Sequence, residues 1–443
     1  MRRHSGPSAS RLARRPAGPV AFGAAWTPAQ LPAGVGLAWL EGELGDLGPT
    51  DAGAAALADA GASDASVVGF WLDRAAGKSL KQATAGARPY AGYSAKGKGV
   101  AIHGDGAARY LAAASNIAGA RHVFADVAFR GNNATRSIGD EPDNFVSQYQ
   151  AYVAGDAVVN PSSVLLLGDT GTNNISALIA GNYYKNGVLT SPKNVGRQRV
   201  WQVARFSRTS ADMDTGKLRV LTYPSGLLWA QGALRRVIVL HNSASADDIA
   251  NVQAYMDRKF AGTPVVACTL DSLSACLDLP QNEAWPHLLW RNRWRGTVSV
   301  PNFGIPGRLI LTAVADDPAK MAAVKGSGKN IIVLQGGAND ILAGASAATT
   351  WSRLQSYISM AVSAGWQVVV CSIADGTGYS AGQRTEISTL RGLIAAGYAG
   401  AGASGYVDLF AAAPALRADG IHYSTAGAVT VADAIGPVVD TLL

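Results

Sequence analysis

The chain has 443 residues, of which 48% are hydrophobic and 16% charged, and its formal net charge is +7. With this composition the chain can bury hydrophobic cores and need not be disordered. The length is too great for one ordinary core, so we expect two domains and a tail. No uninterrupted apolar stretch of about 18 residues occurs, and we therefore expect no membrane-spanning helix. Histidine is scarce and the three cysteines match no zinc-binding spacing, so we expect buried thiols and neither a metal nor another cofactor.

Residues 1–25 are predicted to form a basic, flexible arm. Five arginines lie within the first 15 residues, and no acidic residue precedes Glu41. Such an arm could contact nucleic acid, anionic lipid or an acidic protein, or could simply be solvated. A signal peptide is the competing interpretation, but proline and glycine interrupt its short apolar part. The remaining charge is spread out and predicts no nucleic-acid-binding face.

Residues 26–262 show the pattern of a β domain. In His122 to Arg130 apolar residues alternate with polar or small ones, as in a strand with one buried face. Further strands are predicted at Val164 to Leu167, Trp201 to Phe206, Leu218 to Tyr223 and Val237 to Leu240. Asn, Gly, Asp and Ser clusters separate these runs, which is typical of an antiparallel sandwich.

Two short sequence motifs predict local structures within this domain. Asn186-Gly187 predicts a tight hairpin, because both residues tolerate positive φ. Near the end of the domain, Ser245 and Asp248 predict the capped start of a helix with one apolar face. Gly262-Thr263-Pro264 then predicts the linker to the next domain.

Residues 263–443 alternate between short apolar runs and helical stretches. This rhythm predicts a parallel sheet covered by helices, an α/β/α fold of the flavodoxin-like type. The helices are expected at Ala347 to Ala364 and Gln383 to Ala396. The strands are expected at Val265 to Cys268, Thr297 to Val300, Ile331 to Leu334, Gln367 to Ser372 and Tyr406 to Leu409.

Four polar segments follow strands of this sheet, where ligands of such folds bind. They are Leu270-Asp271-Ser272-Leu273, Asn302-Phe303-Gly304-Ile305, Gly337-Ala338-Asn339-Asp340 and Asp419-Gly420-Ile421-His422. Acyl transfer needs a hydroxyl nucleophile, a base and donors for the developing oxyanion. Ser272 is the candidate nucleophile, His422 the base and Asp419 the group that orients it. The oxyanion donors are expected to be the N–H groups of Ser272 and Gly304 and the Asn339 amide.

Together these segments resemble the four sequence blocks of the SGNH (GDSL-like) hydrolases, named after Ser, Gly, Asn and His. Ser272, Gly304, Asn339 and His422 match the four residues, and Asp419 precedes the histidine by three positions as in that family. The resemblance implies a serine esterase of α/β/α fold. The first block departs from the family pattern, because Leu270 replaces the usual glycine. If this position needs a strained backbone, the leucine has an energetic cost.

The N-terminal domain resembles the concanavalin/laminin-G-like jelly rolls of phage and bacterial surface proteins. The likeness rests on Trp71-Leu-Asp, Gly104-Asp105-Gly106 and Arg236-Val-Ile-Val-Leu before the capped helix. It implies an extracellular or virion-associated protein that holds an acylated cell-surface polysaccharide and removes its acyl groups, O-acetyl above all. The arm would contact other virion or tail proteins, and a homo-oligomer is compatible with this arrangement. The alternative is a phage tail or fibre protein, structural or receptor-binding, whose hydrolase domain is degenerate.

A second serine competes for the role of nucleophile. Gly378-Tyr379-Ser380-Ala381-Gly382 matches the nucleophile elbow of α/β-hydrolases, and Asp408 and His422 follow in the order of that fold. However, Ala374 to Thr377 separate this motif from the end of the strand, whereas an elbow turns directly off it. Gly168-Asp169-Thr170 also resembles a catalytic block, but we expect it to be a turn.

Overall fold

The computed structural model describes residues 26–41, 47–48, 68, 70–75, 79–85, 88–93, 100–105, 111–117, 119–129, 153–154, 181–190, 201–208, 216–220, 231–279 and 283–443. The predicted arm, the predicted strand Val164 to Leu167 and the segment Gly168-Asp169-Thr170 lie outside these residues. Within the described residues, none of the helices combines the length and the apolar character needed to span a bilayer.

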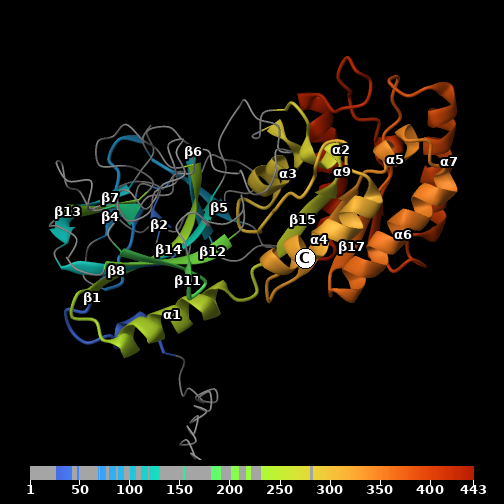
Figure 1. Ribbon diagram of the computed structural model, residues 1–443. Coiled ribbons are helices and arrows are strands. Elements are labelled where there is room, and N and C mark those ends of the chain that lie inside the picture. Colours follow the sequence, from blue (N-terminus) through green and yellow to red (C-terminus); the bar gives the residue numbers. More distant parts are fainter. Residues whose placement is uncertain are drawn as a thin grey trace, which may run out of the picture.

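The N-terminal region contains two antiparallel sheets among the described residues (Figure 1). The first has the order β11-β10-β12-β8-β14-β6-β5, with β1 also paired to β14, and the second has the order β2-β3-β4-β7-β13-β9. Their strands are β1 (Gly36–Glu41), β2 (Leu47–Gly48), β3 (Phe70–Trp71), β4 (Leu80–Lys81), β5 (Tyr90–Tyr93), β6 (Val100–Asp105), β7 (Leu111–Ile117), β8 (Ala120–Phe129), β9 (Val153–Ala154), β10 (Gly181–Lys185), β11 (Val188–Thr190), β12 (Trp201–Arg208), β13 (Gly216–Val220) and β14 (Gln231–His241). Antiparallel pairing agrees with the predicted β domain, whereas the jelly-roll connectivity stays a prediction.

Strand β8 is buried on both faces, which differs from the half-buried strand predicted for His122 to Arg130. It lies between β12 and β14, and its residues from His122 to Ala128 are all buried. Helix α1 (Ala246–Phe260) covers one face, where its Met256 packs with Phe124. The alternation of polarity therefore predicted the strand correctly, but it did not predict that both faces of the strand are buried.

The two short sequence motifs of this region have the predicted structures. Asn186 (φ 49°) and Gly187 (φ 78°) form the turn between β10 and β11. Ser245 caps α1 by accepting a hydrogen bond from the Asp248 N–H, and the Asp248 carboxylate accepts one from the Ser245 N–H. This capping box satisfies two of the backbone donors that a helix start otherwise leaves unpaired.

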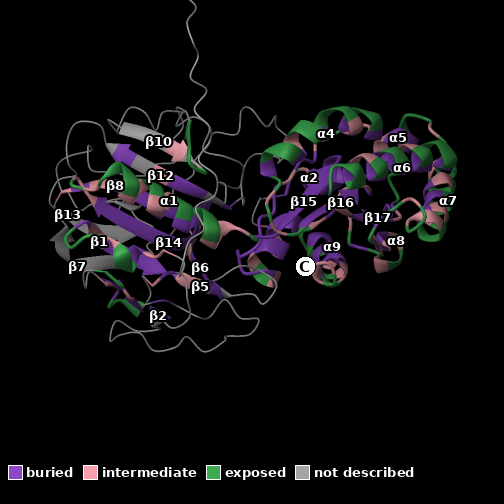
Figure 2. Cartoon of the chain, turned by 90° about the horizontal axis from the view of Figure 1, so that it is seen from below, coloured by how far each residue is buried: buried purple, intermediate pink, exposed green. Residues whose placement is uncertain are grey.

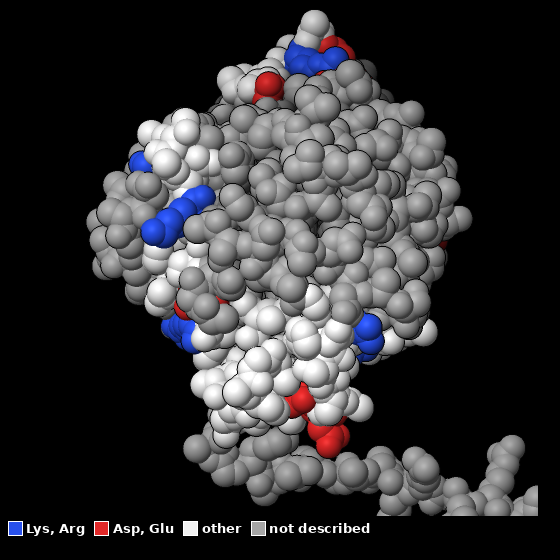
Figure 3. All heavy atoms as spheres, turned by 90° about the vertical axis from the view of Figure 1, so that its left-hand side faces the viewer, with Lys and Arg blue, Asp and Glu red and all other residues white. Residues whose placement is uncertain are grey.

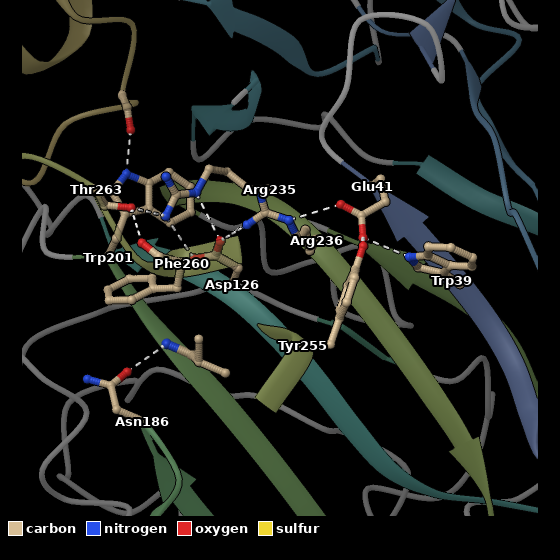
Figure 4. A network of polar contacts seen from close by, with 12 residues as sticks. Trp39, Glu41, Asp126, Asn186, Trp201, Arg235, Arg236, Tyr255, Phe260 and Thr263 are labelled. Atoms are coloured by element: carbon tan, nitrogen blue, oxygen red, sulfur yellow. Dashed lines mark hydrogen bonds and ion pairs between the residues drawn. The ribbon is translucent and has the colours of Figure 1, made fainter. Parts of the chain in front are cut away.

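A buried cluster of charges fastens α1 to the sheet (Figure 4). Arg235 and Arg236 of β14 both donate to Asp126 of β8, at 3.0 and 2.6 Å. Arg236 also donates to Glu41 at 2.9 Å, and the Tyr255 hydroxyl of α1 donates to the same carboxylate. The two arginines and two acids balance in charge, so neither sign is left uncompensated in the interior.

The N-terminal region and the C-terminal domain share a packed interface. Trp201 of β12 donates its backbone N–H to the Ser299 hydroxyl at 3.0 Å and its indole N–H to the Gly296 carbonyl at 2.7 Å. Arg235 stacks over the Trp201 ring, with 3.9 Å between its guanidinium carbon and the ring centroid, and donates to Thr263 at 3.1 Å. Thr263 is buried, so the predicted linker Gly262-Thr263-Pro264 is a packed junction rather than a loose connection.

The C-terminal domain is a parallel sheet between two layers of helices, as predicted. Among the described residues the strand order is β15-β16-β17-β18, and Figure 2 shows α4, α5 and α6 on one side of the sheet and α8 and α9 on the other. The strands are β15 (Val265–Leu270), β16 (Asn330–Gln335), β17 (Gln367–Cys371) and β18 (Gly405–Val407). The helices are α2 (Ser272–Ala275), α3 (Trp285–Leu288), α4 (Ile310–Val324), α5 (Ala338–Leu342), α6 (Ala347–Ser363), α7 (Ala381–Gly397), α8 (Leu409–Ala412) and α9 (Thr425–Asp440), with a π-helical turn at Leu289–Arg293.

Thr297 to Val300 does not form the predicted regular strand. The segment still runs parallel to β15, with single bridges from Ser299 to Val265 and from Asn302 to Cys268. Pro301 lies between the two bridges and has no N–H to donate to a ladder, so the pairing is interrupted there. The segment therefore acts as an irregular edge that brings Asn302 to Gly304 alongside the carboxyl end of β15.

Candidate active site

The nucleophile candidate lies at the sharp turn between β15 and α2. Asp271 caps α2 by accepting a hydrogen bond from the Leu273 N–H at 2.9 Å. Ser272 is the first residue of this helix, so its own N–H has no acceptor within the helix. The turn therefore presents a hydroxyl and a backbone donor from the same residue.

Leu270 has φ 112°, in the region that L-residues rarely adopt. The resemblance to the SGNH family places a glycine here, and the positive φ explains that preference. The Leu270 side chain is buried, so its packing offsets part of the backbone strain. The departure from the family pattern thus adds strain to the turn without removing the conformation that the nucleophile needs.

The acid–base residues form a continuous chain of hydrogen bonds with the serine. His422 Nε2 lies 2.9 Å from Ser272 Oγ, and His422 Nδ1 lies 2.9 Å from Asp419 Oδ2. Because a carboxylate only accepts, Nδ1 carries the proton and Nε2 is free to accept the serine proton. The predicted trio of Ser272, Asp419 and His422 therefore has the geometry of a catalytic triad.

Asp419 stays ionised over a wide pH range. Its Oδ1 accepts hydrogen bonds from the N–H groups of Ile421 at 2.8 Å and His422 at 2.9 Å. Burial opposes ionisation, but these backbone bonds and the His422 ring outweigh it and lower the pKa of Asp419 to about 2. The carboxylate beside His422 is thus a charged hydrogen-bond acceptor at neutral pH.

The three predicted oxyanion donors differ in whether they already make a hydrogen bond within the protein. Asn339 lies on α5, and its Nδ2 makes one long hydrogen bond, at 3.3 Å, to the Arg308 carbonyl. The Gly304 N–H donates to the Asn302 side chain at 2.9 Å, so it is engaged within its own loop. The Ser272 N–H and the second Nδ2 hydrogen of Asn339 remain the open donors of the predicted three.

Gly307 is a donor candidate that the sequence reasoning missed. Pro306 and Gly307 form a turn closed by the Arg308 N–H on the Ile305 carbonyl, with Gly307 at φ 75°. A Cβ at Gly307 would meet no atom within 4 Å, so this face of the turn is open. The signal that could have found it is the Pro-Gly pair, which is typical of a type II turn.

Arg308 is the second residue that sequence reasoning missed. Its side chain is buried and donates to the Leu270 carbonyl at 2.9 Å and the Phe303 carbonyl at 2.9 Å. It also donates to Asp317 at 2.8 Å and to Thr269 Oγ1 at 3.0 Å. One guanidinium therefore joins the end of β15 to the loop of the second block. No sequence signal distinguishes such a buried arginine from a surface one.

Asp271 is a buried carboxyl next to the nucleophile. Burial raises its pKa from 3.8 to about 6, although the N–H groups of Leu273 and Gly337 favour the ionised form. Between pH 3.8 and about 6 the folded protein therefore holds more protons than the unfolded chain. In this window Asp271 makes the unfolding free energy fall as the pH rises.

Asp271→Asn is expected to remove this pH dependence. The pKa shift of Asp271 corresponds to roughly 3 kcal/mol. As the pH rises through the window, the unfolding free energy of the variant minus that of the wild type should therefore increase by up to about this amount. Urea unfolding of both proteins at several pH values measures the difference, in which the other carboxyls cancel. If the unfolding free energies of the two proteins changed with pH in the same way across the window, the pKa of Asp271 would not be raised and the prediction would be wrong.

Ser380 has another role in this structure. It is exposed and caps α7, where its Oγ accepts from the Gln383 N–H at 3.3 Å. Asp408, which would be the acid if Ser380 were the nucleophile, accepts hydrogen bonds from Arg391 at 2.6 Å and Ser372 at 3.2 Å. His422 is bonded to Ser272 and Asp419 instead, so the elbow interpretation has no support in the geometry.

Residues 271–429 match the GDSL-like Lipase/Acylhydrolase family. The match begins at Asp271 and includes the four block residues Ser272, Gly304, Asn339 and His422. Together with the parallel sheet, it identifies the C-terminal domain as having the SGNH hydrolase fold. A comparison with curated proteins gives no match.

Several solved structures are similar to part of the chain. TesA is 24% identical, with a TM-score of 0.35, over 40% of this chain and 99% of its own. A catalytic mutant of Axe2, an acetylxylan esterase from Geobacillus stearothermophilus, is 17% identical, with a TM-score of 0.34, over 40% of this chain and 94% of its own. The esterase EstA from Pseudoalteromonas sp. is 17% identical, with a TM-score of 0.33, over 40% of this chain and 97% of its own.

Proposed function

We propose that this protein is a serine esterase in which Ser272, His422 and Asp419 carry out acyl transfer. The observation that carries the proposal is the unbroken chain from Ser272 Oγ through the His422 ring to Asp419, with both distances at 2.9 Å. The family match of residues 271–429 supports the same reaction class.

The geometry supports a two-step reaction. Ser272 Oγ attacks the ester carbonyl carbon while His422 Nε2 takes its proton, and the alcohol then leaves with that proton. A water molecule, deprotonated by His422, attacks the acyl-enzyme, and the carboxylic acid leaves as Ser272 regains a proton. Asp419 remains a carboxylate throughout and stabilises the imidazolium that forms in each step.

The oxyanion would accept hydrogen bonds from Ser272 N–H and Asn339 Nδ2. As third donor we propose Gly307 N–H, because the Gly304 N–H is occupied by Asn302. The Gly307-Arg308 turn lies beside Asn339, since the Arg308 carbonyl accepts the Asn339 amide. Each such donor typically lowers the barrier by about 3 kcal/mol.

The substrate that we propose is an acylated surface polysaccharide, with O-acetyl as the acyl group. The support is the predicted glycan-binding role of the N-terminal region. Figure 3 shows the face of this region, on which the described acidic and basic side chains are scattered and of both signs. A patch of one sign, as for nucleic acid, is not seen among the described atoms of that face. The hydrogen-bonded chain of Ser272, His422 and Asp419 favours this proposal over the alternative, a structural or receptor-binding phage tail or fibre protein with a degenerate hydrolase domain.

A serine-reactive phosphonate tests the proposed nucleophile. Trypsin cuts after Lys and Arg, so Ser272 lies in the peptide 260–291 and Ser380 in the peptide 354–384. The label is expected on peptide 260–291, at Ser272 rather than Ser274 in its fragment spectrum, together with loss of p-nitrophenyl acetate turnover. Label on peptide 354–384, or turnover that survives complete labelling, would count against the assignment.

A further inference from the structure

The loop between β17 and α7 lies directly against the turn that carries Asp419 and His422. The Gly378 N–H donates to the Gly420 carbonyl at 3.1 Å. Gly420, at φ 67°, sits at the bend of the catalytic turn. The loop is itself held in place, because Tyr379 is buried and Arg384 of α7 binds Asp375 at 2.8 Å.

Two glycines of this loop allow the close approach. A Cβ on Gly378 would lie 2.2 Å from the Asp419 carbonyl oxygen and 2.6 Å from the Ile421 side chain. A Cβ on Gly376 would lie 2.1 Å from the Gly420 carbonyl oxygen. Since real Cβ atoms do not approach backbone atoms this closely, a methyl group at either position must displace the turn or the loop.

The catalytic turn has little freedom to absorb such a displacement without moving its side chains. It closes a short hairpin in which the Arg417 N–H donates to the His422 carbonyl at 2.8 Å and Leu416 pairs with Tyr423. Arg417 also binds Asp278, just after the nucleophile helix, at 2.8 Å. A displacement of residues 419–421 therefore changes the position of the His422 ring relative to Ser272.

We propose that Gly376 and Gly378 are positioning residues for the acid–base pair: their missing side chains set the distance between the β17–α7 loop and the Asp419–His422 turn. The inference rests on the proposed esterase function and adds a role for a motif, Gly378 to Gly382, whose serine is not the nucleophile. Triad geometry must hold to about 0.5 Å for full activity, so a shift caused by one methyl group is enough to impair proton transfer.

The same motif supplies a matched control. Gly378 and Gly382 both lack positive φ, so alanine is compatible with either backbone conformation. At Gly382 a Cβ would meet nothing within 4 Å, whereas at Gly378 it meets the catalytic turn. The pair of Gly378→Ala and Gly382→Ala therefore compares the same added methyl group with and without a contact to the catalytic turn.

We expect Gly378→Ala to lower kcat for p-nitrophenyl acetate by about 100-fold with little change in KM, and Gly382→Ala to leave both unchanged. Gly376→Ala is the second variant and should act like Gly378→Ala. With [¹⁵N]histidine-labelled protein, the resonance of the His422 Nδ1–H bonded to Asp419 should shift in the Gly378 and Gly376 variants and stay in place in the Gly382 variant. A loss of global stability that left the turn in place would not change the His422–Asp419 hydrogen bond, and this resonance would then stay where it is in the wild type.

The outcomes separate the two proposals. A wild-type protein without turnover would defeat the esterase proposal. An active wild type whose Gly378→Ala and Gly376→Ala variants keep its kcat and its histidine spectrum would overturn the positioning role. A Gly382→Ala variant as slow as Gly378→Ala would overturn it as well, because the effect would then come from the loop as a whole.

Discussion

Ser272→Ala is expected to lower kcat for p-nitrophenyl acetate by a factor on the order of 10⁴ to 10⁶, the range seen when a serine hydrolase loses its nucleophile. The physical reason is that His422 Nε2 bonds to Ser272 Oγ, while the hydroxyl of the neighbouring Ser274 donates to the Thr269 carbonyl and so does not replace it. Initial rates at saturating substrate measure the effect.

His422→Ala should cost about as much as Ser272→Ala, and the double variant little more than either alone, because the two residues act as one unit. Ser380→Ala is the control. It removes only a helix cap, so it should cost about 1 kcal/mol of stability and leave kcat unchanged. Turnover that persists in Ser272→Ala and disappears in Ser380→Ala would transfer the reaction to the second serine.

Arg308→Leu is expected to lower the unfolding free energy by up to about 3 kcal/mol, the lower end of the usual cost of breaking a buried ion pair, because Asp317 keeps the Lys320 ammonium at 3.6 Å and the Tyr357 hydroxyl at 2.8 Å. Asp317 would lose its bidentate hydrogen bonds at 2.8 and 3.2 Å, and the Leu270 carbonyl would lose its donor. Urea unfolding at constant pH measures the loss. Activity should fall too, because the strained turn before Ser272 depends on that carbonyl bond.

The double variant Arg308→Leu/Asp317→Asn should recover part of the lost stability, since the asparagine carries no buried charge that needs the lost guanidinium. Arg391→Met, which breaks the partly exposed pair with Asp408, is the control and should have a smaller effect. If Arg308→Leu were no more harmful than Arg391→Met, Arg308 would not be the link between the first two blocks.

The parts of this structure that the sequence predicted best are those with local causes. The hairpin at Asn186-Gly187 and the capping box of Ser245 depend on residues within a few positions of each other. Two of the candidate site residues could be placed from the sequence because the blocks of Ser272 and Asn339 follow β15 and β16 of a parallel sheet, whose carboxyl ends meet at one edge. The family resemblance of the four blocks supplied their roles.

The parts that could not be predicted depend on contacts between distant segments. Nothing near Arg308 in the sequence shows that it meets Thr269 and Leu270 in the interior. The course of Asn302 to Gly304 beside β15 depended on the pairing that Pro301 interrupts, whereas the Gly304 N–H bond to Asn302 is a local contact between residues two positions apart. Burial of both faces of β8 likewise depended on where α1 returns to the sheet.

The packed junction between the two regions has a consequence for how such modules can be exchanged. A cut between Gly262 and Thr263 would look natural in the sequence, yet it would separate Arg235 from Thr263 and Trp201 from Ser299. A hydrolase domain grafted onto another carrier would therefore present unmatched polar groups and an apolar face where Trp201 had been. We therefore expect the N-terminal region and the C-terminal domain to be transferable together, with their interface, rather than either one alone.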